Sequence, residues 1–214
     1  MRPSKATLLV AFLVALSAWS GVLIQSWINI VDEGGVVPGV IRLSRYFTIL
    51  TTTGVALTFS ATLLRRRHLP HGLLTGVLLA TLITGIVYYL LLAQLRSLSG
   101  IDLVADHLLH TTTPALALLF WLGFAPRAPL RGWTPLVWLG WPLTYSIYGV
   151  GRGMMEGVYP YYFINLEELD WIGLAISLAQ FAAAFAVGGY GLWGVNHSIV
   201  QWTRKTGAAH SNPG

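Results

Sequence analysis

Residues 6–27, ATLLVAFLVALSAWSGVLIQSW, contain no charged side chain. As a helix, this stretch would rise about 33 Å, enough to cross the roughly 30 Å hydrocarbon core of a bilayer. Arg2, Lys5 and the segment 15–18 also allow a cleaved signal peptide, but the apolar run continues to Trp27, beyond the length of a typical signal sequence. The stretch therefore predicts a retained transmembrane helix.

The composition of the whole chain also indicates a membrane protein. Hydrophobic residues make up 55% of the 214 positions and charged residues only 10%, against about 25% in a soluble domain. The net charge of +5 is spread between apolar runs rather than gathered on one face, which argues against nucleic acid as a partner. Because the chain has no cysteine, disulfides, thiolate nucleophiles and cysteine-ligated metals are excluded.

The apolar stretches predict an all-α, polytopic membrane protein. Each stretch is helical because a backbone in lipid must satisfy its own hydrogen bonds. We expect a compact bundle of six transmembrane helices in a single domain over residues 1–200, followed by a short cytoplasmic tail at 201–214. The expected spans are Ala6–Trp27, Phe47–Leu64, Leu73–Leu95, His107–Phe124, Trp133–Tyr148 and Trp171–Val195.

The basic residues predict the orientation, because cytoplasmic loops carry an excess of Lys and Arg. With a cytoplasmic N-terminus, nine basic residues fall inside: Arg2, Lys5, Arg65, Arg66, Arg67, Arg127, Arg131, Arg204 and Lys205. Four fall outside: Arg42, Arg45, Arg96 and Arg152. Both termini are therefore predicted to be cytoplasmic.

Two polar side chains within the expected spans can share one depth in the bilayer. Thr48 lies three residues into the second span from Arg45, and His110 lies four residues beyond Asp106 in the fourth. Both spans run inward, so both side chains would sit about 5–6 Å below the outer boundary. A threonine hydroxyl becomes a nucleophile when a neighbouring base accepts its proton, and a neutral imidazole can do so.

Neighbouring residues extend this catalytic hypothesis. Asp106 would orient the His110 ring and stabilise its imidazolium form, with His107 in a supporting role. The substrate-binding candidates carry donors near the outer interface. They are Arg45, Arg152, Tyr145, Tyr148 and Tyr159.

A structural interpretation of the same residues stays open. Threonines in membrane helices commonly bond the carbonyl four residues earlier, and Thr51, Thr52 and Thr53 suit that role. The run Tyr159–Phe163 is typical of an aromatic belt at the membrane interface.

Three motifs resemble the androgen-induced protein family, whose animal members include the androgen-dependent TFPI-regulating protein. These are the segments RYFT at 45–48 and DHLLHTTTP at 106–114, and the run WPLTYSIY at 141–148 with its continuation to Phe163. The last resembles the bacterial branch of the family. Thr52 stands where many bacterial members have asparagine.

The resemblance implies a function. The animal members are integral-membrane hydrolases that cleave fatty acid esters of hydroxy fatty acids, so the resemblance assigns Thr48 as nucleophile and His110 as base. It implies a lipid substrate taken from the bilayer, no cofactor or metal, and a place in a bacterial inner membrane. It leaves the oligomeric state open.

Two other classes of function remain. A transporter for lipids or small molecules would place charges or broken helices near the midplane, and the expected span centres carry no charge. A divalent metal site could use His107 and His110 with Asp106 or Asp102, and with Glu156 as a ligand from another helix.

Overall fold

The backbone forms helices joined by short connections. The computed structural model describes the backbone of residues 3–210 and the side chains of residues 3–205, and within these limits it contains no strand. The helices are α1 (Lys5–Asp32), α2 (Val36–Leu43), α3 (Phe47–Arg65), α4 (His71–Val87), α5 (Gly100–His107), α6 (Thr113–Gly123), α7 (Thr134–Trp138), α8 (Gly140–Glu156) and α9 (Trp171–His210).

Five helical segments are long and apolar enough to cross a membrane. They are Lys5–Asp32, Phe47–Arg65, His71–Leu95, Gly100–Gly123 and Trp171–Lys205. Large apolar side chains on them are exposed, among them Leu23, Trp27 and Val187, which are 58–74% accessible. Such faces are stable in lipid rather than water, so the architecture fits a multi-pass membrane protein.

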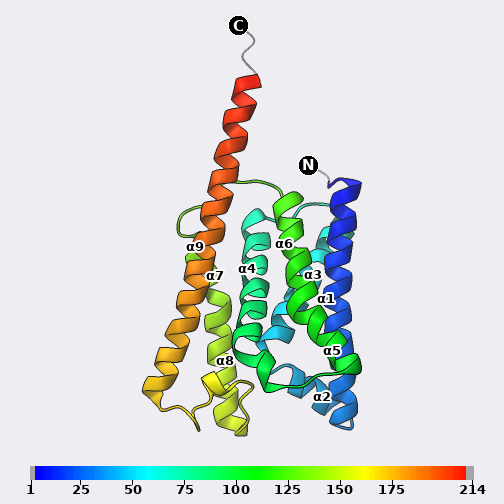
Figure 1. Ribbon diagram of the computed structural model, residues 1–214, viewed down its shortest axis with the longest axis vertical. Helices are drawn as coiled ribbons and strands as arrows, with labels where there is room; N and C mark the ends of the chain where they lie inside the picture. Colours follow the sequence, from blue (N-terminus) through cyan, green and yellow to red (C-terminus); the bar gives the residue numbers. More distant parts are fainter. Residues whose placement is uncertain (1–2, 211–214) are drawn as a thin grey trace.

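The sixth expected span, Trp133–Tyr148, is interrupted. It consists of α7 and α8, which are separated at Leu139 but follow one another along the bundle (Figure 1). Pro142 has no N–H to donate to the carbonyl of Trp138, so the helix loses a hydrogen bond at that point. Whether this pair crosses the membrane stays a prediction.

A short helix that the sequence analysis did not predict follows α1. Gly34, with φ +70°, turns the chain into α2, and Gly39 lets α2 approach the backbone of Ile30. An ion pair between Arg42 and Glu33 links α2 to the end of α1.

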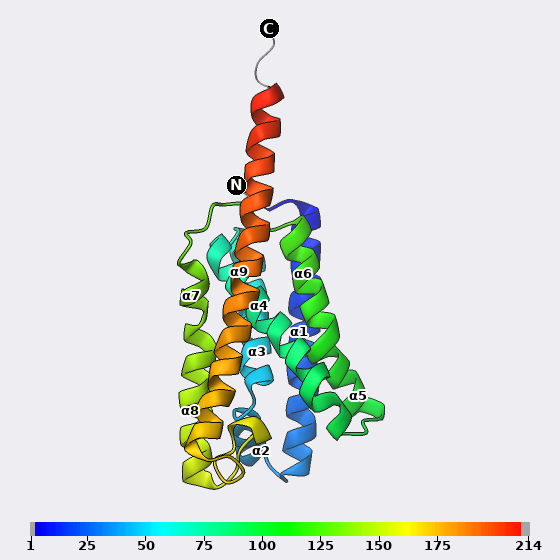
Figure 2. The same cartoon turned by 60° about the vertical axis from the view of Figure 1, so that its left-hand side comes forward.

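The helices divide into two groups that meet at α4. Helix α1 packs against α3, α5 and α6, whereas α9 packs against α4, α7 and α8 (Figure 2). Apolar side chains of α1, α3, α4 and α6 fill the first group, with Val14, Val55, Leu78 and Phe120 almost fully buried.

The two ends of the chain lie at the same end of the bundle. The start of α1 and the C-terminal part of α9 both lie toward the top of Figure 1, and α9 extends well beyond the other helices. The expected tail is thus helical as far as His210. Arg2 and residues 211–214 lie outside the described residues.

Two helices contain a wider, π-helical turn in the half of the bundle away from the chain ends. In Leu108–Thr112 the amide of Thr113 donates to the carbonyl of Leu108, five residues earlier, and in Tyr88–Leu92 the amide of Ala93 donates to Tyr88. Pro114 has no amide hydrogen for the carbonyl of His110, which explains the first wide turn. Such turns are frequent at functional sites.

Gly85 brings α4 against this turn. A Cβ atom at Gly85 would lie 2.7 Å from the carbonyl oxygen of His110. Only a residue without a side chain allows the two backbones to approach this closely.

We predict that Gly85→Ala destabilises the protein by about 1–3 kcal/mol, because the new methyl group overlaps backbone that cannot move aside. Gly54→Ala on α3 is the matched control, since a Cβ there meets nothing within 4 Å. Unfolding in detergent micelles, followed by tryptophan fluorescence, measures both. Equal stability of the two variants would contradict the close packing at Gly85.

Candidate active site

Thr48 lies in the first turn of α3, and its hydroxyl is not used within its own helix. The carbonyl four residues earlier belongs to Ser44 and accepts the Tyr148 hydroxyl at 3.0 Å. Thr53 behaves differently, because its hydroxyl donates to the carbonyl of Ile49 at 2.7 Å. The Thr48 hydroxyl is therefore available to a neighbouring helix.

That neighbour is His110. Its Nε2 atom lies 3.4 Å from Thr48 Oγ1, and the two residues are 62 positions apart in the chain. Its Nδ1 atom lies 3.0 Å from Asp106 Oδ1 and 3.1 Å from the Asp106 carbonyl oxygen. Because a carbonyl only accepts, we assign the proton to Nδ1, which leaves the Nε2 lone pair facing Thr48.

Burial and stacking hold the imidazole in this position. The side chains of His110 and Asp106 are only 11% and 10% exposed. The Tyr88 ring stacks on His110 with centroids 3.7 Å apart and an interplanar angle of 8°, and its hydroxyl interacts with the Asp106 carboxylate. The two π-helical turns thus supply the imidazole and the ring that packs on it.

The structure brings together Thr48, His110 and Asp106, three of the residues singled out from the sequence. This geometry is that of a hydroxyl, a base and an orienting carboxylate. The contact of 3.4 Å is long for a hydrogen bond, as is common for such pairs without substrate.

Tyr161 and Tyr88 belong to this site, and the sequence analysis missed both. Tyr161 lies in the loop between α8 and α9, and its hydroxyl interacts with the Thr48 side chain and with the backbone of Phe47 and Thr48. Burial raises the pKa of Tyr161 to about 12, so the hydroxyl is protonated at neutral pH and can donate. The run Tyr159–Phe163 was interpreted as an interfacial belt, which concealed Tyr161; no sequence signal marked Tyr88.

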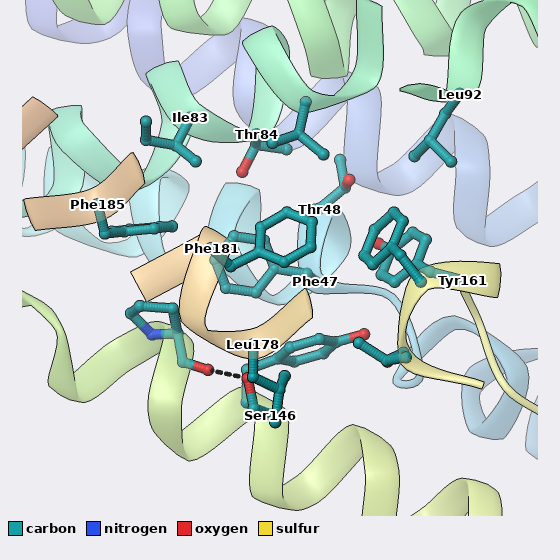
Figure 3. Close-up of a pocket in the computed structure, with 15 residues that line it drawn as sticks. Phe47, Thr48, Ile83, Thr84, Leu92, Ser146, Tyr161, Leu178, Phe181 and Phe185 are labelled. Atoms are coloured by element: carbon teal, nitrogen blue, oxygen red, sulfur yellow. Dashed lines mark hydrogen bonds between the residues drawn. The ribbon is translucent and has the colours of Figure 1, made fainter. Parts of the chain in front are cut away.

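Two cavities meet at Thr48. A narrow one of about 60 Å³ is lined mainly by apolar side chains, among them Phe47, Ile83, Leu178, Phe181 and Phe185 (Figure 3). A wider one of about 550 Å³ is lined by His110, by polar and charged groups of α1, α2 and the segment 96–102, and by apolar side chains such as Ile28 and Leu109. Thr48, Leu92 and Tyr161 line both.

The two arginines predicted to bind substrate, Arg45 and Arg152, lie outside both cavities. Arg45 Nη2 and Arg152 Nε pair with the carboxylate of Glu156 at 2.7 and 2.6 Å, and Arg152 also donates to the Tyr148 hydroxyl. Neither arginine lines the two cavities, and Tyr148 does not either. In this structure these residues join α8 to the segment between α2 and α3.

Three other residues predicted to bind substrate or to support His110 make no hydrogen bond to the side chains of Thr48 or His110 within the described part of the chain. Tyr145 lines the apolar cavity, but its hydroxyl donates to the carbonyl of Arg45 at 2.6 Å. Tyr159 packs on Gly153, where a Cβ would lie 2.2 Å from its ring. His107 is exposed on the outer surface of α5. Nothing in the sequence distinguishes Tyr161, which lies beside Thr48, from Tyr145 and Tyr159, whose side chains have other contacts.

The predicted metal ligands do not converge. Within the part of the chain that the structure describes, no group of three or more His, Asp or Glu side chains is arranged to hold a metal ion. Glu156, the proposed third ligand, is engaged by the two arginines.

At the opposite end of the bundle, His71 and Asn196 form a buried pair that the sequence analysis did not predict. His71 Nε2 lies 2.7 Å from Asn196 Oδ1, and the Asn196 amide donates to the carbonyl of Ala128. The sequence analysis gave His71 no site role, and in the structure it joins α4 to α9.

No protein-family model, curated protein or solved structure matches the chain. The resemblance to the androgen-induced protein family thus stays a prediction from three motifs.

The ion pairs of Glu156 predict an acid-sensitive contact. The hydrogen bond from Arg152, together with Arg45, holds the pKa of Glu156 below its usual range. A lowered pKa in the folded state stabilises the fold above the usual carboxyl pKa, and this stabilisation is lost as the pH falls through the lowered value.

We therefore predict that acidification from pH 6 to pH 3 lowers the melting temperature of the wild type more than that of Glu156→Gln. Glu167→Gln, in the neighbouring loop, is the control and should follow the wild type. Identical pH profiles for Glu156→Gln and the wild type would show that the pairs contribute no stability.

Proposed function

We propose that this protein is an intramembrane lipid ester hydrolase in which Thr48 is the nucleophile and His110 the general base. The observation that carries the proposal is the contact of 3.4 Å between Thr48 Oγ1 and His110 Nε2, with Asp106 on the other ring nitrogen. The position of Thr48 at the junction of two cavities supports it, because a reacting ester needs room on both sides.

The proposed reaction has two steps. Thr48 Oγ1 attacks the acyl carbonyl while its proton passes to His110 Nε2, and the alcohol leaves with that proton. Water then attacks the acyl-threonine, giving its proton to His110, and the free fatty acid leaves as the Thr48 hydroxyl is restored. Asp106 stabilises the imidazolium in both steps.

Tyr161 is the donor best suited to stabilise the oxyanion. Its protonated hydroxyl is next to Thr48, whereas the hydroxyls of Tyr145 and Tyr148 already donate to backbone carbonyls. Amides in the first turn of α3 lack intrahelical acceptors and can add to this stabilisation.

We further propose six membrane crossings, with both chain ends in the cytoplasm of a bacterial cell and the site in the outer half of the inner membrane. The excess of basic residues at the end of the bundle that carries the chain ends supports this orientation. A fatty acyl substrate could then enter sideways from the lipid.

The absence of cysteine makes the topology directly testable with single-cysteine variants. We predict that Arg67→Cys, Arg131→Cys and Lys205→Cys react with a membrane-impermeant maleimide only after the inner face is exposed. Glu167→Cys should react in intact cells. Labelling of Arg131→Cys and Glu167→Cys from the same side would show that α7 and α8 do not cross the membrane.

The catalytic roles are tested with a generic ester, p-nitrophenyl octanoate, and a fluorophosphonate probe. We predict that Thr48→Ala abolishes probe labelling and turnover, and that His110→Ala lowers kcat by about 10²–10⁴-fold because the general base is lost. Thr48→Ser should retain labelling at residue 48, located by mass spectrometry.

Thr53→Ala is the matched control, since it removes a hydroxyl from the same helix that bonds only its own backbone. It should keep wild-type activity. Turnover that survives in folded Thr48→Ala or His110→Ala would overturn the proposal, and thermal unfolding of each variant establishes that it is folded.

A further inference from the structure

The two cavities at Thr48 differ in chemistry, and this difference limits the substrate. The narrow cavity is lined almost entirely by apolar side chains from α3, α4, α8 and α9, such as Val87 and Leu178. An extended hydrocarbon chain is the ligand that such a lining favours, because each buried methylene group leaves water.

In the wider cavity, called the polar cavity below, polar and charged groups stand among apolar side chains such as Ile28, Leu43 and Leu109. Gln25, Asn29 and Asp32 of α1 line one part of it, and Arg96 and Asp102, from the connection between α4 and α5, line another. Among the described residues, no salt bridge engages Asp32, Arg96 or Asp102. A hydrocarbon chain here would displace the water from these groups without replacing its hydrogen bonds, which is unfavourable.

The position of His110 assigns the two halves of the ester to the two cavities. His110 lines the wide polar cavity and not the narrow apolar one. In ester cleavage, the base that takes the nucleophile's proton returns it to the leaving alcohol, so the alcohol oxygen must lie on the His110 side. The attacking water must arrive from that side too.

We propose that the substrate is an ester of one fatty acyl chain with a small polar alcohol, of the glycerol or glycerophosphate type. The carbonyl end of the acyl chain occupies the apolar cavity, whose volume of about 60 Å³ leaves the rest of a long chain outside it. The alcohol occupies the polar cavity and leaves from that side. This inference rests on the proposed hydrolase function and adds a substrate class to it, which differs from the esters of hydroxy fatty acids that the resemblance implies.

The test compares esters that share an acyl chain and differ in the alcohol. The purified full-length protein in detergent micelles is given 1-oleoylglycerol, propyl oleate or octadecyl oleate at equal mole fractions, and released oleate is measured. Glycerol and propanol have the same number of carbons, so that pair isolates the hydroxyl groups. We expect kcat/KM for 1-oleoylglycerol to exceed that for propyl oleate by about tenfold, with octadecyl oleate slowest.

Variants on each side of Thr48 test the assignment. Asn29, 5% exposed on the wall of the polar cavity, is replaced by leucine of similar size. Asn29→Leu should reduce the preference for 1-oleoylglycerol over propyl oleate. If Asn29→Leu does not fold, Arg96→Gln tests the same wall. Arg96 is exposed, so its replacement should leave the fold intact. Leu178→Asn, in the apolar cavity, should instead weaken the preference for long over short acyl chains.

The outcomes separate the two proposals. Hydrolysis of p-nitrophenyl octanoate with equal or faster cleavage of propyl or octadecyl oleate would overturn the polar-alcohol inference and leave the hydrolase function standing. An unchanged alcohol preference in both polar-wall variants would also overturn it. Loss of every activity and of fluorophosphonate labelling in the wild type would overturn the hydrolase function itself.

Discussion

The carbonyl of His110 is the constraint on which the site depends. Pro114 deprives it of its usual intrahelical donor, the helix widens by one residue, and Gly85 lets α4 close over that carbonyl. In this widened turn the imidazole reaches Asp106 through Nδ1 and Thr48 through Nε2.

The membrane imposes the second constraint. Helices that expose leucine, valine and tryptophan to lipid leave their few polar groups to be satisfied inside the bundle. Three of the six threonines of α3, Thr53, Thr58 and Thr62, bond their own backbone. Thr51 and Thr52 do not have the backbone bonds expected from the sequence, because Thr51 accepts the Trp141 indole N–H and the Thr52 hydroxyl has no hydrogen-bond partner among the described residues. For Thr48, the carbonyl four residues earlier belongs to Ser44, which lies before the helix and already accepts the Tyr148 hydroxyl.

The two cavities that meet at Thr48 have different walls. Helices α8 and α9 contribute to the apolar wall, whereas α1, α2 and the connection between α4 and α5 form much of the polar one. Tyr161 lies where the two walls meet and carries a neutral hydroxyl beside that of Thr48. The ion pairs of Glu156 with Arg45 and Arg152 join α8 to the segment before α3, and so hold together the elements on either side of this junction.

The sequence by itself indicated a helical protein with several membrane-spanning segments and a shared depth for Thr48 and His110, because apolar run length and depth below the interface are local quantities. It also indicated Asp106, four residues from His110 on the same helix. The interruption between α7 and α8 and the helix α2 have local causes, in Pro142 and Gly34, that the sequence analysis did not use. Only the tertiary structure decided the contact of Thr48 with His110, the pairing of Arg45 and Arg152 with Glu156, and the approach of Tyr88 and Tyr161 to the site. These features join segments as many as 113 residues apart, as Thr48 and Tyr161 are, and such contacts depend on how helices pack rather than on the periodicity of any one of them.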